Sequence, residues 1–166
     1  MRFFGRKGDE EARPVAEVYS DLRRQVLGLT PEQLGDAFPA DAQVLAMLME
    51  TGYPEAVATL IAVADGTTSL YFSNGGGVIG AGTHATVADA SQRWLDAAAG
   101  ALPELSAMTD PALPSEGLTQ FVAVTRDGVR GLVAPEDDLG EGRHRLSPLF
   151  HAGHDVITQI RLVEGG

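Results

Sequence analysis

Residues 43–50 read Gln-Val-Leu-Ala-Met-Leu-Met-Glu, and only the two end positions are polar. A run of this length without polar alternation is typical of a strand that is covered on both faces. Two more strands are predicted over residues 57–64 and 67–73, joined at Asp65-Gly66, a pair that favours the tight type I′ hairpin turn. The sequence from 43 to 73 therefore predicts three consecutive antiparallel strands.

Helical periodicity precedes this sheet. Apolar residues spaced at i, i+3, i+4, i+7 and i+11 predict an amphipathic helix that has Pro14 in its first turn and ends near Gly28. The apolar stripe consists of Val15, Val18, Tyr19, Leu22 and Val26. A short second helix is expected after Thr30, which caps it, with Pro31 at the first position and Gln33 three residues on.

The chain after the third strand predicts a helix and a second hairpin. The helix covers residues 86–100, and residues 102–108 are expected to add one more helical turn. Residues 119–126 and 129–134 have the composition of strands and are joined at Asp127-Gly128. Hairpins imply antiparallel pairing, so all the predicted strands belong to one antiparallel sheet.

The end of the chain predicts an acidic loop over residues 135–142 and a final helix that opens at Ser147-Pro148. Gly153 interrupts the apolar stripe of that helix, which indicates either a close packing contact or a locally weak helix. One face of the strand over residues 57–64 is mostly alanine, which lets a helix or a second subunit approach closely. These side chains are Ala58, Leu60, Ala62 and Ala64.

The predicted order is therefore helix, short helix, three strands, helix, two strands, helix. It indicates an α+β fold with a single antiparallel sheet of about five strands. Residues 14–166 are expected to form one α+β domain, and residues 1–13 a mobile N-terminal segment. The order of elements resembles that of secretion-chaperone-like domains, which are small acidic homodimers that escort another protein. Roadblock and profilin-like domains are similar in a looser sense.

Composition limits the choice of partners. The chain of 166 residues has a formal net charge of −11, so we expect nucleic acid and anionic membranes to repel it. Its apolar runs are far shorter than the roughly 20 residues that a membrane helix needs. The chain has no cysteine, which excludes disulfides and thiolate chemistry and fits a cytoplasmic protein. A negative net charge is also typical of a protein that escorts a basic partner.

A glycine-rich run follows the third predicted strand. Gly75, Gly77 and Gly80 match the G-x-G-x-x-G fingerprint, and over residues 75–82 the chain resembles the flavin- and nicotinamide-binding Rossmann families. That resemblance implies a ligand held by Gly75, Gly76, Gly77, Gly80 and Gly82. His84 is then the candidate general acid or base. The surrounding pattern is a hairpin arm rather than a βαβ unit, so a bulged strand end that another backbone approaches is the alternative. A site for anions built from backbone N–H groups is a third possibility.

The histidines offer a metal site as a further hypothesis. His151 and His154 lie three residues apart and could share one helix face, with Asp155 or His144 as a third ligand. The alternative is that His154 borders the core while His151 is solvated. No metal signature accompanies the pair, and we predict neither a metal nor a cofactor.

These observations favour a non-enzymatic protein-interaction module: an adaptor, a chaperone-like protein or an immunity-type binder. We expect it to be acidic, homodimeric and cytoplasmic, with another protein as its partner. The alternative is a small-ligand or nucleotide-binding protein, possibly an enzyme, that uses the loop over residues 75–82. The sequence contains no nucleophile elbow and no Walker loop that would decide for catalysis.

Overall fold

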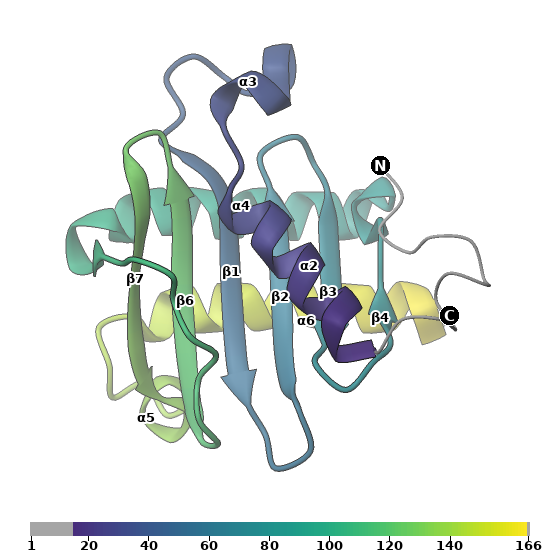
Figure 1. Ribbon diagram of the computed structural model, residues 1–166, viewed down its shortest axis with the longest axis vertical. Coiled ribbons are helices and arrows are strands. Elements are labelled where there is room, and N and C mark those ends of the chain that lie inside the picture. Colours follow the sequence, from purple (N-terminus) through teal and green to yellow (C-terminus); the bar gives the residue numbers. More distant parts are fainter. Residues whose placement is uncertain (1–14, 166) are drawn as a thin grey trace.

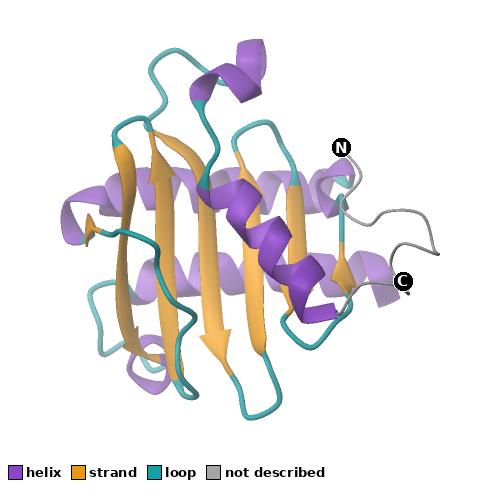
Figure 2. Ribbon diagram, viewed as in Figure 1, coloured by secondary structure: helices purple, strands orange, loops and turns teal. Residues whose placement is uncertain are grey.

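The computed structural model describes residues 15–165 and shows one layer of strands with helices on both faces (Figures 1 and 2). Within these residues, seven strands form a single antiparallel sheet in the order β4-β3-β2-β1-β6-β7-β5. The predicted α+β class with one antiparallel sheet is therefore confirmed. The predicted mobile segment over residues 1–13 and the helix start at Pro14 lie outside the described residues.

The elements have the following bounds. The strands are β1 Val44–Gly52, β2 Val57–Val63, β3 Thr68–Phe72, β4 Gly77–Val78, β5 Ser106–Ala107, β6 Leu118–Thr125 and β7 Gly128–Pro135. The α-helices are α2 Val15–Leu27, α3 Pro31–Leu34, α4 Ala85–Ala101, α5 Glu136–Gly140 and α6 Ser147–Gly165. Short 3₁₀ turns lie at Gly35–Ala37, Ala81–Thr83 and Leu102–Glu104.

Strand β1 is the centre of the sheet. All nine of its residues are buried, and it pairs with β2 on one side and β6 on the other. Leu48, for example, lies opposite Ile61 of β2 and Val122 of β6. Both faces of β1 are covered by other elements, which is why its sequence is apolar at consecutive positions.

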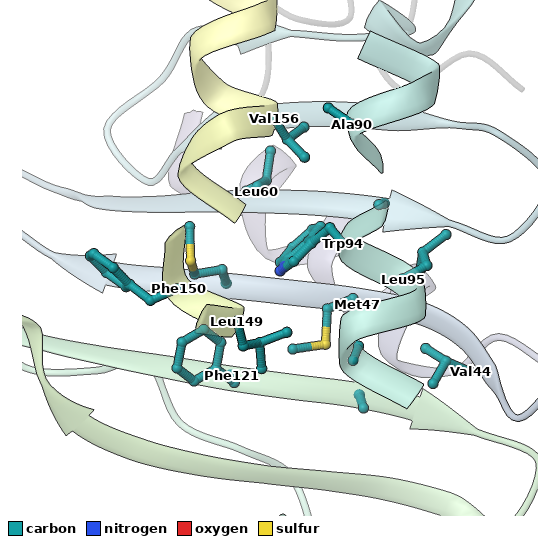
Figure 3. Packing of buried hydrophobic residues seen from close by; sticks show 14 of the residues in the cluster. Val44, Met47, Leu60, Ala90, Trp94, Leu95, Phe121, Leu149, Phe150 and Val156 are labelled. Carbon is teal, nitrogen blue, oxygen red and sulfur yellow. The ribbon is translucent and has the colours of Figure 1, made fainter. Parts of the chain in front are cut away.

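Helices α4 and α6 cross the back face of the sheet (Figure 1). The largest core cluster lies between them and the strands, and Figure 3 shows Trp94 of α4 in its middle, close to Met47 and Leu149. The small side chain of Ala62 in β2 belongs to this cluster, beside Leu60. The sequence left open whether a helix or a second subunit covers this face of β2. In the described structure helices cover it.

Helix α2 runs obliquely across the front face, over β1, β2 and β3 (Figure 1). Its buried residues Val18, Leu22 and Val26 pack in a second cluster that includes Leu48 and Ile61 of the sheet. The predicted amphipathic stripe therefore faces the sheet.

Gly153 in α6 is explained by a close contact. A Cβ atom added there would lie 2.8 Å from the sulfur of Met49 and 3.2 Å from Nε1 of Trp94. Glycine therefore lets α6 approach β1 and α4 at the point where the three elements meet. Of the two interpretations that the sequence left open, close packing is the one that the structure shows.

Two expectations about local structure were wrong, and a third was met in part. The sheet has seven strands rather than about five, because β4 and β5 were not predicted; strands of two residues are too short to carry a periodic pattern. The helical turn expected within residues 102–108 is present as a 3₁₀ turn at Leu102–Glu104, and β5 follows it. The expected acidic loop contains α5, whose first turn holds Glu136, Asp137 and Asp138, where carboxylates favour a helix N-terminus.

Candidate functional site

The glycine-rich run forms a reversal at the edge of the sheet. The chain leaves β3 at Phe72, turns through residues 73–76 and returns as β4, with Gly77 opposite Tyr71. Four glycines of the run have positive φ angles, which other residues adopt only with strain. They are Gly75 at 117°, Gly76 at 83°, Gly77 at 144° and Gly80 at 74°. The N–H of Gly75 donates to the carbonyl oxygen of Phe72 at 3.0 Å, which closes the turn.

Two glycines of the run lie directly against other backbone. A Cβ at Gly77 would be 2.4 Å from the carbonyl oxygen of Leu70, and one at Gly82 would be 2.0 Å from that of Gly66. The run therefore has the geometry of the sequence-based alternative, a strand edge that another backbone approaches. The hollow beside Gly75 and Gly76 has a volume of about 20 Å³, which is the room of about one water molecule. Ligand binding by Gly75, Gly76, Gly77, Gly80 and Gly82 stays a prediction.

His84 is the last residue before α4 and its side chain is exposed. Its backbone carbonyl accepts the N–H of Ala88 at 2.9 Å, while its side chain makes no capping hydrogen bond. The structure thus keeps His84 next to the glycine run, at the N-terminus of α4. A role in catalysis stays a prediction.

His151 and His154 both lie on α6 but in different surroundings. His151 is exposed, whereas the half-buried His154 packs against Phe150 with its ring centroid 4.3 Å from that of the phenylalanine. Burial lowers the pKa of His154, and the nearby charges of His151 and Arg161 act in the same direction. Nε2 of His154 is buried and has no hydrogen-bond partner among the described residues.

Of the two candidate third ligands, Asp155 follows His154 on α6, whereas His144 lies before the helix. Nδ1 of His144 accepts the backbone N–H of Leu146 at 2.9 Å, ahead of the first turn of α6. Within residues 15–165, no three His, Asp or Glu side chains are grouped so that they could hold a metal ion.

The most heavily bonded polar cluster is one that the sequence did not predict. Glu50 of β1 is fully buried, and its two carboxylate oxygens accept from Nε and Nη2 of Arg23 at 2.7 and 2.9 Å. Thr59 of β2 donates to the same carboxylate at 3.0 Å, and Gln120 of β6 at 3.1 Å. The hydroxyl of Tyr19 shares a hydrogen bond with that of Thr59. Three strands and α2 therefore meet at one carboxylate.

The cluster fixes the charge of its members. Burial raises the pKa of Tyr19 to about 12, so the phenol is neutral at any physiological pH. Burial alone would lower the pKa of Arg23, but its hydrogen bond to Glu50 and the charge of Glu50 outweigh that effect and raise it. The guanidinium is therefore a permanent cation held in a two-bond contact, the strongest geometry for a carboxylate partner.

Residues 108–117, which we call the strap, cross the front of the sheet from β5 to β6 (Figure 2). The carbonyl oxygen of Pro111 accepts from Nη2 of Arg23 at 2.8 Å, and that of Ala112 accepts from Nε2 of Gln120 at 2.8 Å. The strap is thus bound by two donors that also hold Glu50.

A hollow of about 250 Å³ lies between α2 and the strap. It is lined by Tyr19, Ser20, Arg23, Arg24, Leu27, Asp110, Pro111 and Leu113. Clefts that hold drug-sized molecules have volumes of roughly 300–1,000 Å³. The hollow is smaller than these, and its size and mixed lining suit one or two side chains of a partner.

The sequence carried one signal for this cluster. Glu50 ends a strand that is predicted to be covered on both faces, and a buried carboxylate requires a partner. Arg23 lies outside the apolar stripe of its helix, so the sequence pattern does not distinguish it from an exposed arginine. Nothing in the spacing shows that these two residues, 27 positions apart, would meet.

Comparison of the chain with protein-family models, with curated proteins and with solved structures finds no match. None of the helices within residues 15–165 combines the length and the apolar character that a membrane span requires.

Proposed function

We propose that this chain is a non-enzymatic protein-interaction module, an adaptor, chaperone-like protein or immunity-type binder that works as a cytoplasmic homodimer. The observation that carries the proposal is the hollow between α2 and the strap. It is concave, it opens on the front face, and its size fits side chains of another protein.

One exposed apolar side chain lines this hollow, and another lies beside Gln120. Leu113 of the strap is 41% exposed, and Val133 of β7 is 42% exposed. Val133 lies opposite Gln120 in the sheet, and Gln120 donates to the carbonyl oxygen of Ala112, the residue before Leu113. Val133 and Leu113 therefore both lie near Gln120. Apolar residues around a concave surface with a polar rim are typical of protein–protein interfaces.

The charge of the chain favours a protein partner. Asp and Glu number 23 against 12 Lys and Arg, and several arginines are engaged internally. Arg23 binds Glu50, Arg126 donates to three backbone carbonyls, and Arg130 donates to the carbonyl of Leu105. The acidic side chains therefore dominate the surface potential, which supports a basic protein segment as partner and opposes nucleic acid and anionic lipid.

A second candidate is a small-ligand or nucleotide-binding protein, possibly an enzyme, that uses residues 75–82. It is supported by the position of the exposed His84, directly between the glycine run and the first turn of α4. The double variant Gly77→Val with His84→Ala tests this candidate, because it should abolish binding of any small ligand that copurifies with the protein.

Native mass spectrometry on gently purified protein, without chelator, tests the proposal. We expect a dimer or a dimer that carries another polypeptide. Leu27→Asp, on the α2 side of the hollow, should remove the polypeptide, whereas Leu162→Asp, which changes a 62% exposed leucine on α6, should keep it. A monomer with no bound polypeptide, or a partner that tolerates Leu27→Asp, would contradict the proposal. An added mass that matches a nucleotide or metal would favour the second candidate.

A further inference from the structure

We infer that the strap occupies a seat for an extended, proline-containing segment of a partner protein, and that the partner displaces the strap when it binds. This inference rests on the proposed function and names the surface and the chemistry of the partner. The seat consists of Tyr19, Arg23 and Leu27 on α2 together with Gln120 on β6.

The strap has the sequence of a peptide that such seats recognise. Residues 111–114 read Pro-Ala-Leu-Pro and form no regular secondary structure. Pro-x-x-Pro segments favour the polyproline II conformation, in which no internal hydrogen bonds form and the carbonyl oxygens remain free to accept from a partner. Proteins that bind these segments combine aromatic surfaces with side-chain donors.

The seat recognises the main chain of the strap. Arg23 and Gln120 donate to two consecutive carbonyl oxygens, those of Pro111 and Ala112, both at 2.8 Å. Neither hydrogen bond depends on the side chain of the strap residue. A different extended segment would therefore accept the same two hydrogen bonds.

Glu50 holds the donors in place. Nη2 of Arg23 and Nε2 of Gln120 also bond to Oε1 of Glu50, at 2.9 and 3.1 Å. Glu50 is fully buried under α2 and belongs to the central strand, so the position of the two donors does not depend on the strap. A binding surface that is fixed before its ligand arrives loses less conformational entropy on binding.

Side chains on both sides of the hollow complete the seat. Pro111 and Leu113 line the hollow from the strap, Tyr19 and Leu27 line it from α2, and Pro114 is buried. The two prolines thus have the spacing of a Pro-x-x-Pro ligand, with an aromatic ring on the other side of the hollow.

Between its ends the strap is held by the hydrogen bonds at Pro111 and Ala112 and by the buried Pro114, and most of its other residues are exposed. Seven of its ten residues are exposed: Thr109, Asp110, Ala112, Leu113, Ser115, Glu116 and Gly117. Its first residue, Met108, donates to Val129, and at its other end the carbonyl of Ser115 lies against Gly52, where a Cβ would come within 2.2 Å. Residues 109–114 lie between these fixed points, and segments with few buried contacts open at low free-energy cost.

The negative charge of the chain favours partners that carry basic residues beside their prolines. The net charge of −11 attracts a segment whose prolines are flanked by lysine or arginine. The partner is therefore an extended Pro-x-x-Pro segment with basic flanks.

The test uses the full chain with residues 110–114 replaced by an equal length of Gly and Ser, and a labelled synthetic peptide with the sequence of residues 108–117. Fluorescence anisotropy measures binding. The peptide should bind this variant at least about tenfold more tightly than the wild type, because the strap in the wild type competes at a high effective concentration. Adding lysines at both ends of the peptide should tighten binding further, and less so at high salt.

Matched controls separate the seat from unspecific binding. In the strap-replaced variant, Gln120→Ala should weaken binding about tenfold, which is the effect of one lost hydrogen bond. A peptide in which alanine replaces both prolines should also bind more weakly. Equal binding to the wild type and to a folded strap-replaced variant would overturn the inference, as would a peptide that tolerates loss of both prolines.

A single substitution provides a second test, in case the variant with residues 110–114 replaced does not fold. Pro114→Gly in the full chain should raise amide hydrogen exchange in residues 109–113 and strengthen peptide binding; unchanged binding despite faster exchange would count against the seat. If Pro114→Gly chains instead exchange straps between two copies, the occupant is a second copy and a foreign partner is refuted. A partner that is retained in native mass spectra while the peptide fails to bind would refute the seat and leave the proposed function intact.

Discussion

The ion pair between Glu50 and Arg23 allows the sharpest test of the structure. In Arg23→Met, the fully buried Glu50 carboxylate keeps only the neutral donors of Thr59 and Gln120. Removing one partner of a buried ion pair costs about 3–5 kcal/mol, because the remaining charge is uncompensated. A domain of this size has a total stability of about 5–15 kcal/mol. The variant should therefore lose a large share of its stability, with a melting temperature roughly 10 °C lower.

The double variant Glu50→Leu with Arg23→Met separates the charge from the packing. Thr59 still bonds to Tyr19 and Gln120 to the carbonyl of Ala112, and the half-buried carbonyl group of Pro111 loses its donor in both variants. Replacing both members of a buried pair with apolar residues is often neutral. We expect the double variant to lie within about 1–2 kcal/mol of the wild type.

Urea unfolding followed by circular dichroism measures all three proteins, with a constant slope as the check for two-state behaviour. Arg24→Met is the matched control, because Arg24 pairs with Asp21 in an exposed contact on the same helix. Such contacts contribute about 0.3–0.5 kcal/mol. The reasoning is wrong if Arg23→Met costs no more than this control, or if the double variant is as unstable as Arg23→Met.

Three more outcomes follow from contacts described above. Gly153→Ala should destabilise by about 1–3 kcal/mol despite better helix propensity, whereas Gly100→Ala, with open space around it, should stabilise by about 0.5–1 kcal/mol; thermal unfolding compares them. Gly82→Ala should lower the melting temperature more than either, because its Cβ meets a backbone carbonyl rather than a flexible side chain. The lowered pKa of His154 means that the unfolded chain, with a pKa near 6.5, binds its proton more readily. Stability should therefore be full above pH 6.5 and fall below it, and urea midpoints should show this slope in His151→Gln but not in His154→Gln.

The sequence predicted the elements whose signals are local. Asp65-Gly66 and Asp127-Gly128 each lie where two antiparallel strands join, as expected. The predicted type I′ turn was wrong, because that turn needs positive φ at both residues and only Gly66 and Gly128 have it, at 98° and 123°. The continuous apolar run over residues 43–50 became the central strand. These predictions needed no knowledge of distant contacts.

The features that the sequence did not predict depend on long-range contacts. Strand β5 exists because Ser106 and Ala107 lie beside β7, and their own side chains indicate nothing. The partners of Glu50 come from α2, β2 and β6, which are brought together only by the folded sheet. Gly82 was predicted as a ligand residue, and its close approach to the backbone of Gly66 arises only in the folded chain.

The two outermost strands have a consequence for the solution behaviour of the protein. Strands β4 and β5 have two residues each, and β7 ends at Pro135, which has no N–H to donate. An edge this short offers another sheet very few hydrogen bonds, which is how natural β-proteins avoid joining edge to edge. We therefore expect concentrated solutions to stay free of fibrils, and any lasting contact between copies to involve helices or sheet faces rather than a shared, extended sheet.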